Sequence, residues 1–203
     1  LRARLPDVTA KAGVVPLDEV LREERDRAGR VGIPEGSKVG CGTFYTDGAA
    51  VHPAEPWLRR AAWGAAWRGA EGEWRCRAGA VPGRQTVGRA ELAAVVWVAR
   101  GGGKGAVIYS DSRYVVNGCA RLREGCKGWV EGSRDGDLWG ELGRLGVPEV
   151  AWVPAHHDRE AFERRGFPGH AWEGNREADR VAGDKVREVA PRGWLVERQN
   201  QRL

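Results

Sequence analysis

The chain has 203 residues, of which 41% are hydrophobic and ten are tryptophan, so it can form one domain with a sizeable core. This composition excludes an intrinsically disordered protein, and no apolar run approaches the length of a membrane span. The formal net charge of +5 fits a polyanionic partner without requiring one.

Residues 1–37 differ from the rest of the chain, because prolines punctuate them and residues 17–29 (LDEVLREERDRAG) are highly charged with few apolar positions. We expect a linker or interdomain segment here. The chain starts at Leu1 without a signal-peptide pattern, so we also expect a fragment, a processed product or a piece of a longer open reading frame.

Three strands are predicted next, at residues 42–46, 61–68 and 74–81, and a glycine-bearing turn at 69–72 joins the last two. The connections are short, so the three strands are expected to form an antiparallel meander.

The remaining elements alternate between helix and strand. Residues 89–100 (RAELAAVVWVAR) carry alanine and leucine in helical phase, and the glycines at 101–103 stop this helix. A helix between two strands implies a parallel crossover, so the sequence predicts an α/β fold with a mixed sheet and helices packed on it. The further predicted elements are a strand at 106–110, helices at 112–122 and 137–145, a strand at 150–154 and a helix at 173–189.

Three acids fall at particular places in these elements. Asp47 is predicted just past the first strand, Asp111 just past the fourth, and Glu91 in the first turn of the helix after the meander. The carboxyl ends of neighbouring parallel strands face one crevice, so these acids are expected to share it if strands one and four are neighbours. Clustered carboxylates repel one another unless a cation lies between them, and Mg²⁺ prefers oxygen ligands of this kind.

Each acid also has an ordinary structural interpretation. Asp47 before a glycine is a turn former, Asp111 before a serine can cap a helix, and Glu91 near a helix N-terminus complements the helix dipole. Singly, these interpretations are the more common ones. The coincidence of three acids at one expected crevice favours the metal site.

Five short motifs then occur in a fixed order along the chain. They are TDG at 46–48, RAEL at 89–92, YSDS at 109–112, WVPAH at 152–156 and GNREAD at 174–179. Together they resemble a type 1 ribonuclease H domain over roughly residues 39–189, although each motif alone is weak. The resemblance implies an α/β, ribonuclease H-like five-stranded mixed sheet, with strands one to three antiparallel, flanked by helices. We place this domain at residues 38–190 and a C-terminal tail at 191–203.

The resemblance implies a metal-dependent endonuclease that hydrolyses the RNA strand of RNA–DNA hybrids by a two-metal-ion mechanism. The four carboxylates of that family correspond to Asp47, Glu91, Asp111 and Asp179, which would bind two Mg²⁺ ions, with Mn²⁺ as an alternative. Only the GN-x-x-AD match selects Asp179, because its highly charged helix otherwise reads as a solvated surface.

The family also carries a histidine on the loop after the fifth strand. The WVPAH motif assigns this catalytic role to His156, while His157 and His170 compete for it. Residues 158–169 look like an insertion in that loop, which separates the two regions. An ordinary surface histidine is the remaining alternative.

The resemblance also implies contacts with the substrate, some of which depart from the family pattern. Gly88 stands where an asparagine is common, and Arg113 where a glutamine is common. Arg89 and Arg113 can bind backbone phosphates, although Arg89 can equally be a helix-start residue packed along its stem. The predicted substrate-binding residues are Gly48, Thr86, Arg89, Ser112, Arg113 and Asn175.

Residues 119–134 interleave basic residues with Trp129, as in the basic protrusion by which some family members hold the DNA strand. A reduced substrate handle is therefore one interpretation of this segment. Packing of Trp129 in the core is the other.

Two other functions are compatible with the fold. One is a non-catalytic nucleic-acid-binding module of a reverse-transcriptase polyprotein, and the other is a different nuclease of the same fold. No acid is lost, which favours the hydrolase. We expect a monomer with an RNA–DNA hybrid as partner and no membrane association. The start of the chain resembles that of a ribonuclease H domain cut from a retroelement polyprotein, with a covalently linked reverse transcriptase upstream, and a free-standing cellular enzyme is the alternative. The four cysteines show neither zinc spacing nor a disulfide framework, so we expect an intracellular protein, nuclear or cytoplasmic.

Overall fold

The computed structural model describes residues 19, 20, 22, 23, 26, 34, 42–126, 128–155 and 157–201. The linker predicted for residues 1–37 therefore lies largely outside the described residues. Among the described helices, none is long and apolar enough to cross a membrane.

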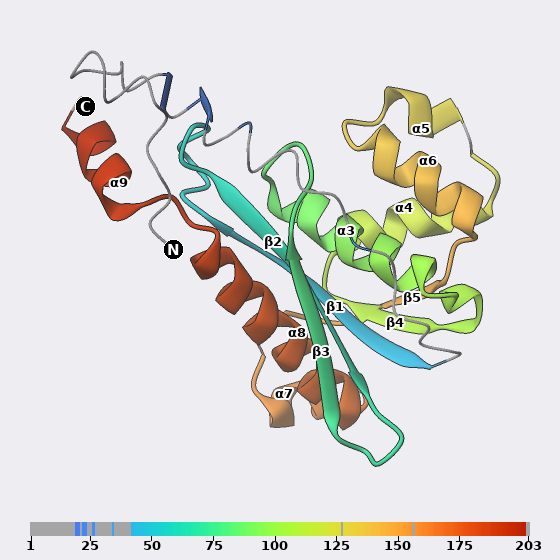
Figure 1. The fold of residues 1–203 in the computed structure, drawn as a ribbon. Coiled ribbons are helices and arrows are strands. Elements are labelled where there is room, and N and C mark those ends of the chain that lie inside the picture. The colour runs from blue at the N-terminus through green and yellow to red at the C-terminus, as the bar shows by residue number, and fades with distance from the viewer. Residues whose placement is uncertain are drawn as a thin grey trace.

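A five-stranded mixed sheet with the order β3-β2-β1-β4-β5 forms the centre of the molecule (Figure 1). β1 pairs with β2 and β2 with β3 in antiparallel fashion, whereas β4 is parallel to both β1 and β5. The predicted fold class and strand directions are thus confirmed. The strands are β1 (Thr43–Val51), β2 (Arg60–Arg68), β3 (Trp74–Ala80), β4 (Val107–Ser110) and β5 (Glu149–Trp152).

The first strand is longer than predicted. The sequence indicated an end at Thr46, but β1 continues to Val51, so Asp47 lies inside the strand and is paired with Gly64 of β2. Glycine and alanine, which occupy positions 48–50, are uncommon in strands. The backbone pairing with β2 nevertheless holds them in the strand. The expectation of a free strand end at Asp47 was wrong.

Helices cover both faces of the sheet (Figure 1). Figure 1 shows α3, α4 and α6 on one side and α8 on the other. The helices are α3 (Val87–Arg100), α4 (Arg113–Arg123), α5 (Gly128–Gly132), α6 (Gly136–Leu145), α7 (Arg159–Arg164), α8 (Gly169–Glu188) and α9 (Gly193–Asn200), with a short 3₁₀ turn η1 (Gly103–Gly105) after α3.

The core beneath α3 is built on aromatic side chains. Alternate residues of a strand point to opposite faces, and Phe44 and Trp63 point toward α3. Trp63 stacks on Trp97 of α3, with ring centroids 5.5 Å apart, and all three side chains are at most 1% exposed. This packing fixes the helix, and hence its N-terminal turn, against β1 and β2.

The opposite face accepts α8 at very close range because two glycines lack side chains. A Cβ on Gly64 of β2 would lie 2.5 Å from the carbonyl oxygen of Ala178, and a Cβ on Gly174 of α8 would lie 2.1 Å from the Tyr45 ring. The backbones of the helix and the strands therefore approach more closely than residues with side chains would allow. This contact sets the position of the later turns of α8 beside β1.

Two helices lie where the sequence indicated loop or tail. Within the predicted insertion at 158–169, Asp158 caps α7, and Phe162 is 1% exposed. In the segment predicted as a tail, Leu195 of α9 is 1% exposed and packs against Leu58 from the β1–β2 connection. Both helices are short, and tertiary contacts of single apolar side chains hold them in place.

Candidate active site

The pairing of β1 with β4 brings the first two acids together. Thr46 lies opposite Ser110 in this parallel pair, so Asp47 and Asp111 are each one residue beyond the last paired position. The predicted neighbourhood of these strands is therefore correct. Asp111 is not the cap of α4, because the Ser112 side chain accepts the hydrogen bond from the Val115 amide.

Glu91 reaches the same place from the other side of the sheet. It lies in the first turns of α3, whose N-cap is Thr86, and that turn crosses β1 directly over Gly48. A Cβ on Gly48 would lie 2.7 Å from the Glu91 amide nitrogen and 2.8 Å from the Ala90 Cβ. Gly48 is thus the residue that lets the helix come close enough for the Glu91 carboxylate to join the cluster.

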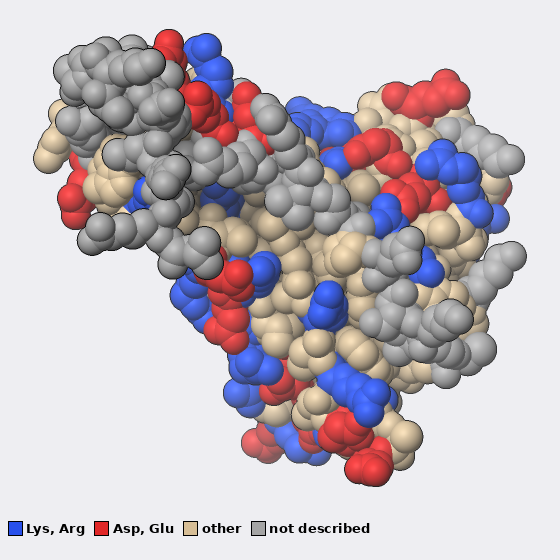
Figure 2. Space-filling model, viewed as in Figure 1, with Lys and Arg blue, Asp and Glu red and all other residues tan. Residues whose placement is uncertain are grey.

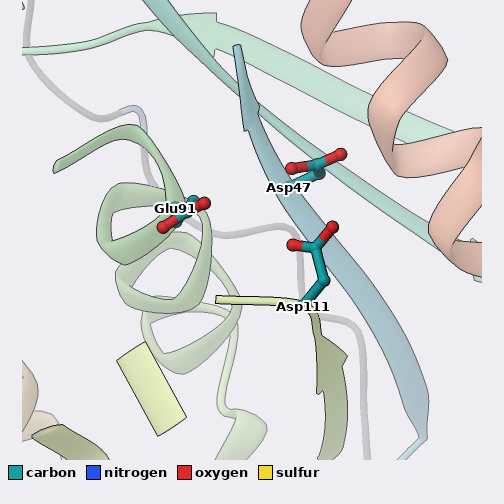
Figure 3. Close-up of side chains that lie close together, drawn as sticks. All are labelled: Asp47, Glu91 and Asp111. Atoms are coloured by element: carbon teal, nitrogen blue, oxygen red, sulfur yellow. The ribbon is translucent and has the colours of Figure 1, made fainter. Parts of the chain in front are cut away.

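Each of Asp47, Glu91 and Asp111 offers a carboxylate oxygen within 4.8 Å of the others, and the three converge from β1, α3 and the end of β4 (Figure 3). Asp47 is only 7% exposed, and its Oδ1 accepts a hydrogen bond of 2.7 Å from the Gly48 amide. Three carboxylates this close, with one of them buried, form a site of concentrated negative charge.

Burial and mutual repulsion shift the protonation of this cluster. Burial, followed by the charge of Asp111, raises the pKa of Asp47 to about 8, although the Gly48 amide opposes the shift. Burial likewise raises the pKa of Glu91 to about 7, against a hydrogen bond from Ser112 that lowers it. In the absence of a cation, the cluster therefore holds protons at pH values where isolated carboxyl groups have lost theirs.

The cluster fits a hard divalent cation. All of its donors are carboxylate oxygens, which are the ligands that Mg²⁺ and Mn²⁺ take in proteins. A bound dication would also replace the protons and offset the repulsion that raises the pKa of Asp47.

Asp179 lies at the rim of this site rather than in the three-acid group. It is exposed, and it lines a pocket together with Asp47, Asp111 and Asn175. Its charge also contributes to the raised pKa of Asp47. Asp179 thus lies beside Asp47 and Asp111, in the pocket that these two acids also line, whereas Glu91 does not line that pocket.

Asn175 stands one turn before Asp179 on the same face of α8. Its Oδ1 is buried and has no hydrogen-bond partner among the described residues. An acceptor that is left without a partner beside a cluster of acids suits a bound water or a hydroxyl donor of a ligand. The predicted substrate role of Asn175 is compatible with this position.

The three histidine candidates have different surroundings. His156 lies outside the described residues, so its role stays a prediction. His157 lines the pocket, and its Nε2 accepts a hydrogen bond of 2.8 Å from Arg165. His170 does not line the pocket; its Nδ1 lies 3.0 Å from the Tyr45 hydroxyl, and its ring packs on Tyr45 and Tyr109.

Of the two arginines predicted to bind phosphate, one is exposed and the other is buried. Arg113 is exposed, and its guanidinium lies 4.0 Å from the centre of the Trp152 ring. Arg89 is 5% exposed, and its guanidinium binds the carboxylates of Asp135 and Asp137. These partners favour the structural interpretation of Arg89, which holds α3 to the start of α6, over a contact with phosphate.

The network around Arg89 extends further from Asp135. This carboxylate, 8% exposed, also accepts hydrogen bonds from Arg84, at 3.2 Å, and from the Tyr114 hydroxyl, at 2.8 Å. Tyr114 in turn accepts a hydrogen bond from Trp139. The N-terminal turn of α3, which carries Glu91, is therefore fixed from α4 and α6.

In the segment at 119–134, Trp129 packs on the buried Trp139, with ring centroids 5.1 Å apart. Arg121 lies 5.6 Å from the centre of the Trp129 ring. Trp129 is only partly buried against the core cluster. The core interpretation of Trp129 thus accounts for its contacts, while the handle stays a prediction.

The sequence analysis missed one wall of the pocket. Phe162 of α7 and Trp172 and Arg176 of α8 line the same pocket as the acids. The signal was present, since Trp172, Asn175, Arg176 and Asp179 are spaced to lie on one face of a helix. The helix was predicted to begin at Glu173, so Trp172 fell outside it, and Arg176 was read as part of a solvated surface.

Comparison with known proteins gives the same picture of the fold. No curated protein sequence matches the chain. The solution structure of the PFV RNase H domain is similar with a TM-score of 0.52 and 22% identity, over 71% of this chain and 93% of that one. This likeness shows a shared fold.

Two further structures are similar at lower scores. LC9-RNase H1, described as a type 1 RNase H with the type 2 active-site motif, has 20% identity and a TM-score of 0.49, over 78% of this chain and 85% of that one. RNase H1 from Halobacterium salinarum NRC-1 has 19% identity and a TM-score of 0.45, over 73% of this chain and 99% of that one.

The family assignment rests on the sequence of the chain. The family model for RNase H matches residues 41–187, which is more than half of the chain and contains all four predicted acids. The chain therefore belongs to the RNase H family.

Proposed function

We propose that this chain is an endonuclease that hydrolyses the RNA strand of RNA–DNA hybrids with the help of two divalent cations, Mg²⁺ or Mn²⁺. The observation that carries the proposal is the convergence of Asp47, Glu91 and Asp111 within 4.8 Å in a chain of the RNase H family. The cations, when bound, supply a water activated for attack on the phosphodiester and stabilise the leaving oxygen.

The residues of the chain have distinct parts in this proposal. Asp47, Glu91 and Asp111 would hold the cations, and Asp179 would complete the set from the rim of the pocket. Ser112 keeps Glu91 oriented through its hydrogen bond, and it also fixes the start of α4. The strands and the start of α3 are rigid elements, so the carboxylates are preorganised before the cations arrive.

Recognition of the RNA strand would rest on its 2′-hydroxyl groups, which distinguish RNA from DNA at a given site. Asn175 has a buried oxygen without a described partner and could accept a hydrogen bond from such a group. The expectation of an upstream reverse transcriptase in the same polyprotein stays a prediction.

A cleavage assay tests this function. A hybrid labelled on either strand is incubated with the chain in Mg²⁺ and in EDTA, beside duplex DNA and duplex RNA. We expect Mg²⁺-dependent cleavage of the RNA strand of the hybrid alone. The absence of such cleavage would overturn the proposed function, and cleavage of duplex DNA would assign the chain to a different nuclease of the same fold.

Two substitutions locate the reaction. Asp111→Asn removes one ligand, and several kcal/mol of charge stabilisation go with it, so the rate should fall by more than about 100-fold. Asp184→Asn is the matched control, because Asp184 is an exposed acid of α8 paired with Arg180 and Arg187. Equal rates for Asp111→Asn and the parent would refute the site.

A further inference from the structure

An arginine side chain lines the pocket beside the acids. Among the described residues that line it, Arg176 is the only arginine or lysine, and it shares the pocket with Asp47, Asp111 and Asp179. Arg176 is exposed and makes no hydrogen bond or salt bridge with any described residue. Its position is nevertheless defined, because its guanidinium lies 4.7 Å from the centre of the Trp172 ring.

Trp172 is itself held in place. Its indole N–H donates a hydrogen bond of 2.8 Å to the carbonyl oxygen of His157, which ties α8 to the loop after β5. A guanidinium stacked on a fixed aromatic ring is restricted to the plane above that ring, while its N–H groups remain available at the edges. Arg176 thus lines the pocket, and its guanidinium N–H groups have no hydrogen-bond partner among the described residues.

The other cations of α8 are arranged differently. Arg180 is paired with Glu177 and Asp184, and Lys185 and Arg187 each have an acidic partner on the same helix. On the face seen in Figure 2, blue and red side chains alternate over α8 and around the end of the β2–β3 hairpin. The described residues of this face therefore present charges of both signs to a polyanion. Arg176 differs from them, because it lies beside acids and has no ion-pair partner among the described residues.

Three acids line the same pocket as Arg176. The charges of Asp111, Asp179 and Glu91 all raise the pKa of Asp47. A phosphate diester that enters this pocket can bind Arg176, because its non-bridging oxygens accept the forked N–H donors of arginine.

We infer that Arg176, positioned by stacking on Trp172, binds a backbone phosphate of the nucleic-acid strand that is cut, within the pocket of Asp47 and Asp111. This inference rests on the proposed function and adds a specific contact to it. Arg176 does not take part in bond breaking. Its contribution is uniform binding, so its loss should raise KM while kcat stays within about twofold.

Salt dependence provides the sharpest test. Binding of a fluorescent RNA–DNA hybrid is measured in EDTA between 50 and 300 mM salt, in an Asp111→Asn background that prevents cleavage. Each phosphate contact adds about 0.7–0.9 to the slope of log K against log salt. Arg176→Gln should therefore reduce this slope by about that amount and weaken binding roughly 5- to 10-fold at 0.1 M salt.

Two matched variants complete the test. Arg180→Gln changes the same charge one turn further along α8, where ion pairs already occupy the guanidinium, and should leave the slope unchanged. Arg176→Lys keeps the charge but loses the forked donors and should retain most of the slope with intermediate affinity. Equal slopes for Arg176→Gln and Arg180→Gln overturn the inference while leaving the proposed function standing. A parent that neither cleaves nor binds the hybrid overturns both.

Discussion

At Asp47, two physical effects act in the same direction. The side chain is 7% exposed, so water solvates its charge poorly, and Asp111 lies close enough to repel that charge. The folded chain therefore keeps a proton on Asp47 up to a pH of about 8, whereas the unfolded chain loses it near the ordinary value of 3.8. Folding and proton binding are consequently linked.

This linkage gives a pH prediction with a definite sign. Between pH 4 and pH 8 the folded state holds a proton that the unfolded state has released, so stability is greatest below this window and falls as pH rises through it. In EDTA, the Tm of the chain should fall from pH 5 to pH 8, and Asp47→Asn should flatten the profile and raise the Tm at pH 8. Thermal unfolding followed by circular dichroism measures this, with Asp184→Asn as control.

Added Mg²⁺ should reverse the loss at pH 8, because a ligand that binds only the folded state stabilises it by mass action, by about 2.7 kcal/mol at 100 times its Kd. The gain should shrink toward pH 5, where protons compete for the same oxygens. A Tm that responds to Mg²⁺ equally in the parent and in Asp47→Asn would contradict the assignment of this site.

At the residue scale, position along the chain was sufficient to find the three clustered acids, because each follows or begins a strongly apolar element. Position along the chain did not reveal the structural role of Arg89, because its partners Asp135 and Asp137 lie more than forty positions away and no local pattern connects them. Asp179 rested on resemblance alone, because a charged helix conceals which of its acids faces a pocket. Arg176 was missed for the same reason.

The contact between β1 and α3 depends on the missing side chain of Gly48. Gly48→Ala would push a methyl group against the Glu91 amide at 2.7 Å, so α3 must move outward and carry the Glu91 carboxylate with it. We expect a loss of about 1–3 kcal/mol in stability and a weaker response of the Tm to Mg²⁺. Urea unfolding with and without Mg²⁺ measures both quantities.

Gly143→Ala is the control for this substitution. Gly143 lies on the exposed side of α6 with no atom within 4 Å of the position of its Cβ, so alanine there should stabilise the helix by up to about 1 kcal/mol. If Gly48→Ala behaves like Gly143→Ala, the close approach of helix and strand is not needed for the site.

The buried ion pair of Arg89 permits a second comparison between elements. Arg89→Met keeps the apolar stem but leaves Asp135, 8% exposed, without its buried cationic partner, so we expect a loss of about 3–5 kcal/mol. Arg113→Met removes only an exposed guanidinium stacked on Trp152 and should cost at most about 1 kcal/mol. Chemical denaturation of both variants measures the difference, and similar losses would argue against the structural role of Arg89.

Element boundaries were predictable where side-chain periodicity alone determines them, as in α3 and α4. Boundaries were harder to predict where strand pairing or tertiary packing determines where an element ends. β1 extends through Gly48 because β2 supplies hydrogen-bond partners, and α7 forms around one buried side chain, Phe162, which gives no periodic signal over six residues.

At the scale of the whole molecule, α9 packs the C-terminal end of the described chain against the β1–β2 connection. Leu195→Ala should cost about 2–5 kcal/mol, because it opens a cavity against the buried Leu58. Trp194→Ala, at a neighbouring side chain that is 38% exposed, should cost less. Both variants should retain the kcat of the parent, since α9 contributes no residue to the described pocket. A large loss of kcat in Leu195→Ala at a temperature where it remains folded would contradict this separation.

The overall architecture was the most predictable level. The order of strands and helices requires a meander followed by parallel crossovers, and few arrangements of a mixed sheet satisfy that order. The boundaries at 38 and 190, the monomeric state and a linked reverse transcriptase stay predictions.

The strand order leaves β3 at one border of the sheet, with Arg75 and Arg77 exposed along it. The open edge of such a strand can pair with a strand of another molecule. A chain with a modest net charge has little overall electrostatic repulsion to prevent this pairing. Arg75 is paired with Glu73, and Arg77 adds a second basic side chain two residues on, so the docking of an identical copy along this strand would bring basic side chains together. The exposed border of the sheet thus carries basic side chains that oppose edge-to-edge self-association.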